Sequence, residues 1–131
     1  MLSSSLMQAK RAIRTILVVD DEVLILGLVR RVLEHGNYTV ITSRNGDHAW
    51  SVVEQGKPKL DLVLTDIVMP GSIDGLALAG KIHRKYRKLP VLFMTGALPE
   101  NDARAVEMAR KGLLLRKPFS PTDLVEFIDS H

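Results

Sequence analysis

The sequence has no cysteine, few aromatic residues and no long apolar run. Without cysteine, the chain forms no disulfide and no thiolate metal site, which is compatible with a cytoplasmic protein. Aromatic residues make up only 5% of the chain, so few rings are present on which nucleic-acid bases could stack. No apolar run approaches the roughly 20 residues that a membrane helix needs. These shortages exclude disulfide-stapled and membrane-inserted classes of protein.

The length and composition suit one globular domain. The chain has 131 residues, of which 46% are hydrophobic, and a formal net charge of +3, which is compatible with a single core. Basic residues gather before residue 15 and in "KIHRKYRK" at 81–88. Solvated faces explain such clusters, so nucleic acid is not expected as a partner. We expect 1–13 to form a flexible tail or linker and 14–131 to form the domain, without a signal peptide.

Apolar segments of strand length alternate with segments of helical periodicity. The first helical segment places Ile25, Leu28, Val29, Val32 and Leu33 on one face and ends at Gly36, and the last begins with Ser120 as N-cap before Pro121. This five-fold alternation predicts an α/β fold with a five-stranded parallel sheet covered by helices on both faces. The strands are predicted at 15–20, 38–43, 60–66, 89–96 and 113–119.

Polar residues collect where the predicted strands end, and such ends form the functional edge of an open parallel sheet. The first strand ends in Asp20 and Asp21, and the third ends in Asp66. Carboxylates that meet at one edge repel each other, and a bound cation relieves this repulsion. Oxygen ligands alone favour a hard ion, so we expect Mg²⁺, with Mn²⁺ as the alternative.

Two further strand ends supply groups that suit an anion. Thr95 and Gly96 follow the fourth strand, and Lys117 ends the fifth. An ammonium, a hydroxyl and backbone N–H groups hold phosphoryl oxygens, and Gly96 leaves room for them. Each residue alone has an ordinary structural explanation, as a turn residue or a solvated side chain. Their joint occurrence predicts phosphoryl transfer to Asp66.

These residues resemble the receiver domain of two-component response regulators over about residues 14–130. The motifs that carry the resemblance are "VVDDE" at 18–22, "DIVMPGSIDG" at 66–75, "MTGA" at 94–97 and "KPF" at 117–119. The resemblance implies a flavodoxin-like fold with strand order 2-1-3-4-5. It also implies a phosphoacceptor rather than an enzyme, whose partner is a sensor histidine kinase or a histidine phosphotransfer protein.

The resemblance assigns a role to individual positions. Asp66 would accept the phosphoryl group, and Asp20, Asp21, Asp66 and the Val68 backbone carbonyl would bind the metal, Asp20 mainly through water. The phosphoryl group would be held by Thr95, Gly96, Lys117 and the Ile67 backbone N–H. Thr95 and Leu114 would occupy the switch positions, and Pro118 would follow a cis peptide bond.

The sequence departs from the family pattern in the loop after Asp66, at the switch and before the fifth strand. Three residues, "GSI", separate Pro70 from Asp74 where the family has two. Leu114 stands where an aromatic residue is usual, and the connection before the fifth strand is about two residues shorter. Val68 and Ala97 are apolar and cannot orient an attacking water, so we expect slow hydrolysis of an aspartyl phosphate.

Several alternatives remain open at this point. The chain resembles receivers of hybrid sensor histidine kinases most, but a stand-alone regulator fits equally well, and its state as monomer or weak dimer stays undecided. A pseudo-receiver that binds a protein without phosphorylation is the main rival. A haloacid-dehalogenase-type phosphatase would need Asp-x-Asp where Glu22 stands, and a dinucleotide-binding domain would need a glycine-rich first loop.

Overall fold

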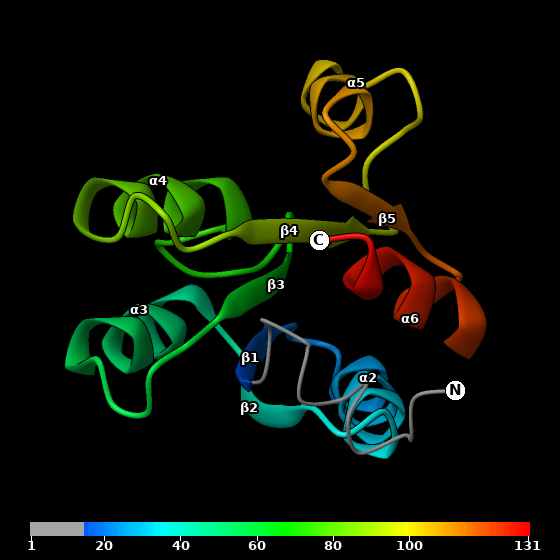
Figure 1. The fold of residues 1–131 in the computed structure, drawn as a ribbon. Helices are drawn as coiled ribbons and strands as arrows, with labels where there is room; N and C mark the ends of the chain where they lie inside the picture. Colours follow the sequence, from blue (N-terminus) through cyan, green and yellow to red (C-terminus); the bar gives the residue numbers. More distant parts are fainter. Residues whose placement is uncertain (1–14) are drawn as a thin grey trace.

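The computed structural model describes residues 15–131, which form one sheet of five strands with five helices around it (Figure 1). The expected tail at 1–13 lies outside the described residues. The strands are β1 (Thr15–Val19), β2 (Thr39–Ser43), β3 (Leu62–Asp66), β4 (Val91–Thr95) and β5 (Leu114–Arg116). The helices are α2 (Val23–His35), α3 (Gly46–Gln55), α4 (Gly75–Lys85), α5 (Ala103–Arg110) and α6 (Pro121–Asp129).

All neighbouring strands pair in parallel, in the order β2-β1-β3-β4-β5. This is the predicted topology. The register places Val19 opposite Thr65 and Asp66 opposite Met94. The carboxyl ends of β1, β3 and β4 therefore meet at one edge of the sheet, where the polar residues of the sequence were expected to collect.

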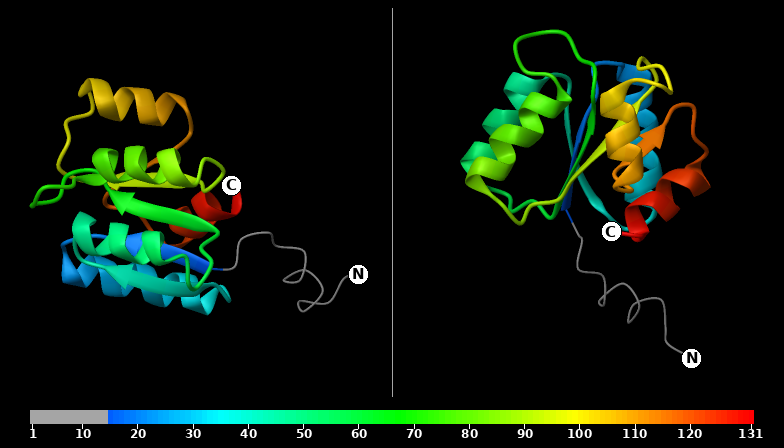
Figure 2. Two further views of the ribbon diagram at one scale, coloured as in Figure 1. Left: turned by 90° about the vertical axis from the view of Figure 1, so that its left-hand side faces the viewer. Right: turned by 90° about the horizontal axis from the view of Figure 1, so that it is seen from above.

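The core is split by the sheet into two apolar layers. Along β1, Leu17 and Val19 belong to one layer, whereas Ile16 and Val18 belong to the other. The first layer is covered by α3, α4 and α5, and the second by α2 and α6. Figure 2 shows α3 and α4 on one side of the sheet and α2 and α6 on the other. Because both faces of the sheet are buried, the strands are apolar throughout instead of alternating.

The buried face of α2 differs from the sequence-based expectation, whereas the end of the helix agrees with it. Leu28 is 42% exposed, and Leu26, which lies two residues earlier, is buried in its place. The apolar residues on α2 are dense enough to fit two helical phases, and only packing against the sheet selects one. The helix ends at Gly36 as predicted, but Gly36 has a φ of −84°, and Asn37 adopts the left-handed conformation.

The last helix begins as the sequence predicts. The Ser120 hydroxyl accepts a hydrogen bond from the Asp123 N–H at 3.0 Å, and the Asp123 carboxylate accepts one from the Ser120 N–H at 3.0 Å. This reciprocal capping box fixes the start of α6 directly after Pro118 and Phe119.

Among residues 15–131, no helix has the length and apolar character needed to cross a membrane.

Candidate functional site

Three carboxylates converge at the carboxyl edge of the sheet. Carboxylate oxygens of Asp20, Asp21 and Asp66 lie within 4.8 Å of one another. Asp20 and Asp66 are buried, and Asp21 is half-buried. They meet because β1 and β3 are neighbours in the sheet and both end at this edge. Such a group of oxygen ligands has the composition of a site for a hard divalent cation.

Lys117 holds this acidic cluster together. Its Nζ donates to Asp20 Oδ2 at 2.7 Å, to Asp66 Oδ2 at 3.0 Å and to Glu22 Oε1 at 3.2 Å. The Lys117 side chain is only 9% exposed, so its charge depends on these partners. The Lys117 N–H donates to the Thr95 carbonyl oxygen at 2.9 Å, and the Lys117–Pro118 peptide bond is cis, as the resemblance implied.

Burial and neighbouring charges oppose each other at Asp66 and at Lys117, and both pKa values are raised overall. Burial raises the pKa of Asp66, although the hydrogen bond and positive charge of Lys117 partly oppose this effect. Burial lowers the pKa of Lys117, but the hydrogen bonds and charges of Asp20 and Asp66 outweigh it and raise that pKa overall. Lys117 therefore stays charged and supplies the cation on which the buried carboxylates depend.

The two buried aspartates are satisfied unequally. Both Asp20 oxygens have partners, since Oδ1 accepts from the Glu22 N–H at 2.9 Å and Oδ2 accepts from Lys117. The Asp66 Oδ1 atom is buried and has no hydrogen-bond partner among the described residues. A buried oxygen without a donor is costly unless a ligand or an ion meets it. The acidic cluster therefore fits a divalent cation, with Asp66 Oδ1 as a ligand atom.

The contacts of the Thr95 hydroxyl and the space beside Gly96 differ from those that the sequence predicted. Thr95 is fully buried, and its Oγ1 accepts a hydrogen bond from the Leu98 N–H at 3.4 Å. No hydrogen bond joins this hydroxyl to Asp66 or Lys117 within residues 15–131. A Cβ at Gly96 would lie 3.3 Å from the Lys117 Cβ. The space beside Gly96 is thus occupied by the Lys117 chain, and Gly96 first of all accommodates that lysine.

The backbone donor beside Asp66 differs from the expected one. The Ile67 N–H donates to the Met94 carbonyl oxygen at 3.1 Å and so extends the ladder between β3 and β4. The Ile67 N–H is therefore already paired here, and its expected contact with a phosphoryl group stays a prediction. Burial raises the pKa of Asp66 overall, and the nearby Val68 backbone N–H makes only a small opposing contribution. β3 ends at Asp66 as predicted, but the Ile67 N–H still makes the last hydrogen bond to β4, so Val68 has the first amide beyond this pairing.

The longer loop after Asp66 is held against α3. Gly71 adopts a φ of +102°, which favours glycine, and the Ser72 hydroxyl donates to the Asp47 carboxylate at 3.2 Å. A Cβ at Gly46 would lie 2.2 Å from the Ile73 carbonyl oxygen, so α3 starts in direct backbone contact with this loop. The longer loop between β3 and α4 thus packs against the start of α3.

The start of α4 also contacts the backbone of the site. A Cβ at Gly75 would lie 2.0 Å from the Asp66 carbonyl oxygen. The Gly75 N–H donates to the Ile67 carbonyl oxygen at 2.9 Å. Only a residue without a side chain allows this approach, so Gly75 helps to set the position of Asp66.

Leu114 and Glu22 lie near the site, the first as a predicted switch residue and the second outside the predicted set. Leu114 lies on β5, half-buried, opposite Phe93 of β4, and packs against the layer that carries α5. Glu22 was not among the predicted site residues, yet its carboxylate is the third partner of Lys117. Its place directly after Asp20 and Asp21 was the available signal. Its side chain is 60% exposed, so it borders the acidic cluster on the solvent side.

Comparison with known proteins gives one consistent family. Residues 16–129 match the model of the response regulator receiver domain. The transcriptional regulatory protein ResD of Bacillus subtilis is 36% identical over 111 residues, which are 84% of this chain and 44% of ResD. The response regulator GtcR of Aneurinibacillus migulanus is 32% identical over 121 residues, which are 89% of this chain and 47% of GtcR. The chain thus spans less than half the length of either relative.

Solved structures agree with this match. A response regulator receiver domain protein from Clostridium thermocellum has a TM-score of 0.76 and 28% identity, over 89% of this chain and 92% of that one. The receiver domain of the hybrid histidine kinase CckA has a TM-score of 0.69 and 26% identity, over 88% of this chain and 96% of that one. The chain belongs to the receiver domain family of two-component response regulators.

Proposed function

We propose that Asp66 accepts a phosphoryl group from a phosphohistidine on a sensor histidine kinase or a histidine phosphotransfer protein. The observation that carries the proposal is the state of the Asp66 carboxylate. It is buried, one oxygen has no hydrogen-bond partner among the described residues, and the other accepts from Lys117 at 3.0 Å. A purely structural aspartate at a strand end would be expected to have its oxygens satisfied by backbone N–H groups.

The transfer is a displacement at phosphorus. An Asp66 carboxylate oxygen forms the new P–O bond while the P–N bond of the phosphohistidine breaks, and the imidazole nitrogen keeps the electron pair. Burial, which raises the pKa of Asp66, also makes its oxygen a stronger nucleophile than a solvated carboxylate. The charge on the phosphoryl oxygens increases the need for cations at the site.

Lys117 and a cation bound by the acidic cluster would provide this positive charge. The Lys117 ammonium, which already contacts Asp66, would turn to the phosphoryl oxygens, and Thr95, Gly96 and the Val68 N–H would contribute further contacts. The residues that would hold Mg²⁺, or Mn²⁺ in its place, are Asp20, Asp21, Asp66 and the Val68 carbonyl. The bound ion would neutralise charge as the phosphoryl group arrives.

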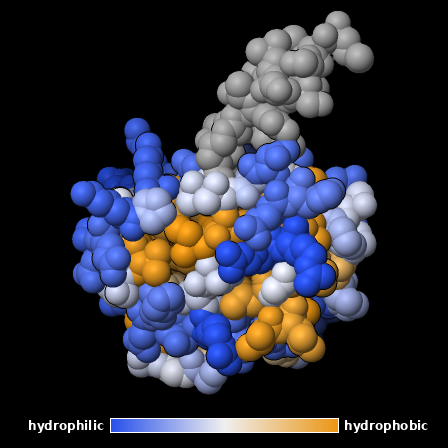
Figure 3. Space-filling model, turned by 90° about the horizontal axis from the view of Figure 1, so that it is seen from below, coloured by the Kyte–Doolittle hydropathy of each residue, from blue (hydrophilic) through white to orange (hydrophobic). Residues whose placement is uncertain are grey.

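Exposed apolar side chains beside the site support docking of a partner. Val23 and Leu24 directly follow Glu22 at the start of α2 and are 55% and 88% exposed, and Val68 is 42% exposed. Figure 3 shows hydrophobic surface on the side of the molecule that carries α2. Apolar groups around a polar centre suit a partner helix that brings its phosphohistidine to Asp66.

The setting of the domain follows from the same proposal. We infer a cytoplasmic phosphorelay module that is a phosphoacceptor rather than an enzyme. It acts either as a stand-alone regulator or as part of a hybrid histidine kinase. Leu114 would replace the usual aromatic residue in reporting phosphorylation, through its contacts with the α5 layer. A pseudo-receiver that binds its partner without phosphorylation is the alternative, favoured by the absence of an aromatic residue at this position.

The test is the intact mass of the chain after incubation with Mg²⁺ and a small phosphodonor such as acetyl phosphate. We expect one added phosphoryl group in the wild type and none in Asp66→Ala or without Mg²⁺. Asp47→Ala serves as the matched control, because Asp47 is an exposed aspartate that only contacts the neighbouring loop. No adduct on the wild type with either acetyl phosphate or a phosphohistidine donor would instead establish the pseudo-receiver.

The lifetime of the adduct provides a second observable. Val68 and Ala97, which lie two residues after Asp66 and Thr95, are both exposed, and neither side chain has a polar group. Without a side chain that orients water, the phosphoryl group should be lost over hours rather than seconds. Val68→Glu should shorten the lifetime by about tenfold, since even a poorly placed general base contributes to hydrolysis. Loss within seconds from the wild type, in a mass time course, would contradict this.

A further inference from the structure

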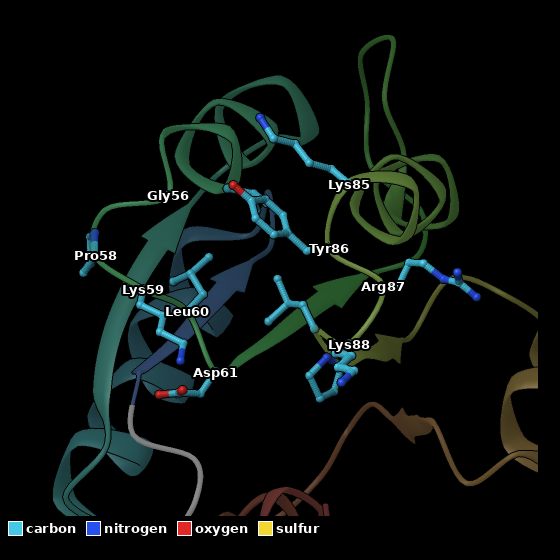
Figure 4. A pocket seen from close by; sticks show the side chains of 12 residues that line it. Gly56, Pro58, Lys59, Leu60, Asp61, Lys85, Tyr86, Arg87 and Lys88 are labelled. Atoms are coloured by element: carbon cyan, nitrogen blue, oxygen red, sulfur yellow. The ribbon is translucent and has the colours of Figure 1, made fainter.

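A second cavity lies at the opposite end of the sheet from Asp66. It has a volume of about 630 Å³ and is formed where α3 and α4 end and where the chain enters β3 and β4 (Figure 4). This volume lies in the range of cavities that bind small molecules. The phosphoryl-transfer chemistry proposed above uses no residue of this cavity.

The rim of the cavity is positively charged. Lys59, Lys85, Arg87 and Lys88 line it, all four are exposed, and none forms an ion pair with a described residue. Asp61 is the acidic residue of the lining, and its carboxylate accepts the Thr15 N–H at 2.9 Å. Figure 4 shows Lys59 reaching towards the cavity and Arg87 pointing away from it. The Lys85 side chain extends past Tyr86 towards α3, and its Nζ lies 5.7 Å from the centre of the Tyr86 ring. Lys59 and Lys88 are therefore the cations at the cavity itself, and Lys85 adds positive charge beside it.

Helix dipoles account for only one of these charges. Cations are favourable at the carboxyl end of a helix, and Lys85 is the last residue of α4. Lys59 and Lys88 lie outside the helices, in the segments that lead into β3 and β4. Their gathering around one concavity is therefore not explained by capping.

The inner wall of the cavity is apolar. Val53 is buried, and Leu60 and Leu89 are half-buried, with all three on the lining. The Tyr86 ring extends from α4 towards α3, as Figure 4 shows, and a Cβ at Gly56 would lie 3.5 Å from its hydroxyl oxygen. A simple inorganic anion would use the lysines but leave this wall in contact with water. The wall favours a ligand that also has an apolar or ring portion.

We propose that this cavity binds a small polyanion that carries a ring, the chemical class of a nucleoside polyphosphate. The phosphates would lie between Lys59 and Lys88, with the charge of Lys85 nearby, and the ring would lie against Leu60, Leu89 and Tyr86. A nucleic-acid duplex would require a broad basic surface, whereas these charges surround a concave site of small-molecule size. The proposal does not rest on the phosphoacceptor role of Asp66.

The probe is ATP, titrated into the full chain in the presence of a chelator so that no divalent cation joins it to the acidic cluster. Calorimetry gives the affinity, and amide chemical shifts give the location. We expect saturable binding with shifts at Gly56, Leu60 and Leu89. Lys59→Gln/Lys85→Gln/Lys88→Gln should weaken binding at least tenfold, whereas the corresponding triple Arg variant should keep it within a few-fold.

The matched control removes three charges elsewhere. Arg104→Gln/Arg110→Gln/Lys111→Gln has the same net charge as the glutamine variant, and its positions lie on or next to α5, outside the cavity lining. It should bind ATP as the wild type does. Equal loss in both glutamine variants would show binding to net charge only and would overturn the proposal. A cooperative urea transition in each variant establishes that it is folded.

Two smaller ligands test the contribution of the charge and that of the ring separately. Pyrophosphate contains the charge without the ring, and adenosine contains the ring without the charge. We expect each to bind more weakly than ATP, with shifts at the same amides. Adenosine that binds as tightly as ATP, or ATP that shows no saturable binding in the millimolar range, would overturn the proposal. Binding of an acidic peptide but not of ATP would overturn it in favour of a protein partner.

Discussion

The two ends of the sheet treat charge in opposite ways. At the carboxyl end, Asp20 and Asp66 are buried, and one lysine that is 9% exposed meets both of them. At the other end, Lys59, Lys85 and Lys88 are exposed around a cavity and form no ion pair with a described residue. Buried charges depend on specific partners, while water and salt stabilise exposed ones. Substitutions at the two ends should therefore differ in size and in salt dependence.

The largest effect is expected from removing the cation of the buried end. Lys117→Met leaves Asp20 and Asp66 without their shared donor and should lower the free energy of unfolding by about 3 kcal/mol. Lys111→Met is the control, because Lys111 pairs with Glu107 on the surface at 3.5 Å and should cost no more than about 0.5 kcal/mol. Urea unfolding measures both, and similar losses would show that the two ends do not differ as described.

A smaller loss should follow from a methyl group added beside the backbone of Asp66. Gly75→Ala places a Cβ where 2.0 Å separates it from the Asp66 carbonyl oxygen, and should cost about 2 kcal/mol. Gly27→Ala should instead stabilise the chain by about 0.5 kcal/mol, because no atom lies within 4 Å of that Cβ and the position is helical. Thermal unfolding distinguishes the two, and stabilisation by both substitutions would contradict the close approach at Gly75.

The ionised Asp66 carboxylate should lower the free energy of unfolding. Since burial raises the pKa of Asp66, its ionised form disfavours the folded state, and Asp66→Asn should add about 1 kcal/mol at neutral pH. This gain should fade as the pH falls through the folded-state pKa towards the ordinary value of about 3.9, where the wild-type carboxyl is protonated. Urea unfolding across the pH range tests this, with exposed Glu54→Gln as the control. A gain that grows towards acid pH would have the wrong sign.

The smallest effect is expected at the exposed end. Lys59→Gln/Lys88→Gln relieves repulsion between solvated cations and should stabilise the chain by a few tenths of a kcal/mol at low salt. The difference should vanish at high salt, because exposed charges are screened, whereas the loss in Lys117→Met should persist. Unfolding measured at two ionic strengths decides this. A salt-independent effect at Lys59 and Lys88 would place them in a buried environment.

The fold and the acidic cluster could be predicted because they depend on local patterns. A carboxylate at the end of one apolar strand must lie near a carboxylate at the end of the neighbouring strand, which brings Asp66 to Asp20 and Asp21. The orientation of a single amide or side chain was not predictable in this way. The Ile67 N–H pairs with Met94, and Leu28 turns to solvent, because the exact length of the ladder and the phase of a helix depend on packing.

Contacts between segments that are distant in the chain could not be predicted from the sequence pattern. Ser72 meets Asp47 across 25 residues, and the basic cavity brings Lys59 together with Lys85 and Lys88. In the sequence, Lys59 lies in the segment before β3, whereas Lys85 ends α4 and Lys88 lies in the segment before β4, so no shared periodicity connects them. Only the parallel topology, which places the entries to β3 and β4 side by side, makes them neighbours.

The most direct test of the central claim is to identify the residue that carries the phosphoryl group. After incubation with Mg²⁺ and acetyl phosphate, borohydride reduction converts an aspartyl phosphate to homoserine, which peptide mass spectrometry locates. We predict homoserine at position 66, and none there when Mg²⁺ is left out. Homoserine at Asp20, Asp21 or another position, with Asp66 intact, would contradict the assignment of Asp66 as the acceptor.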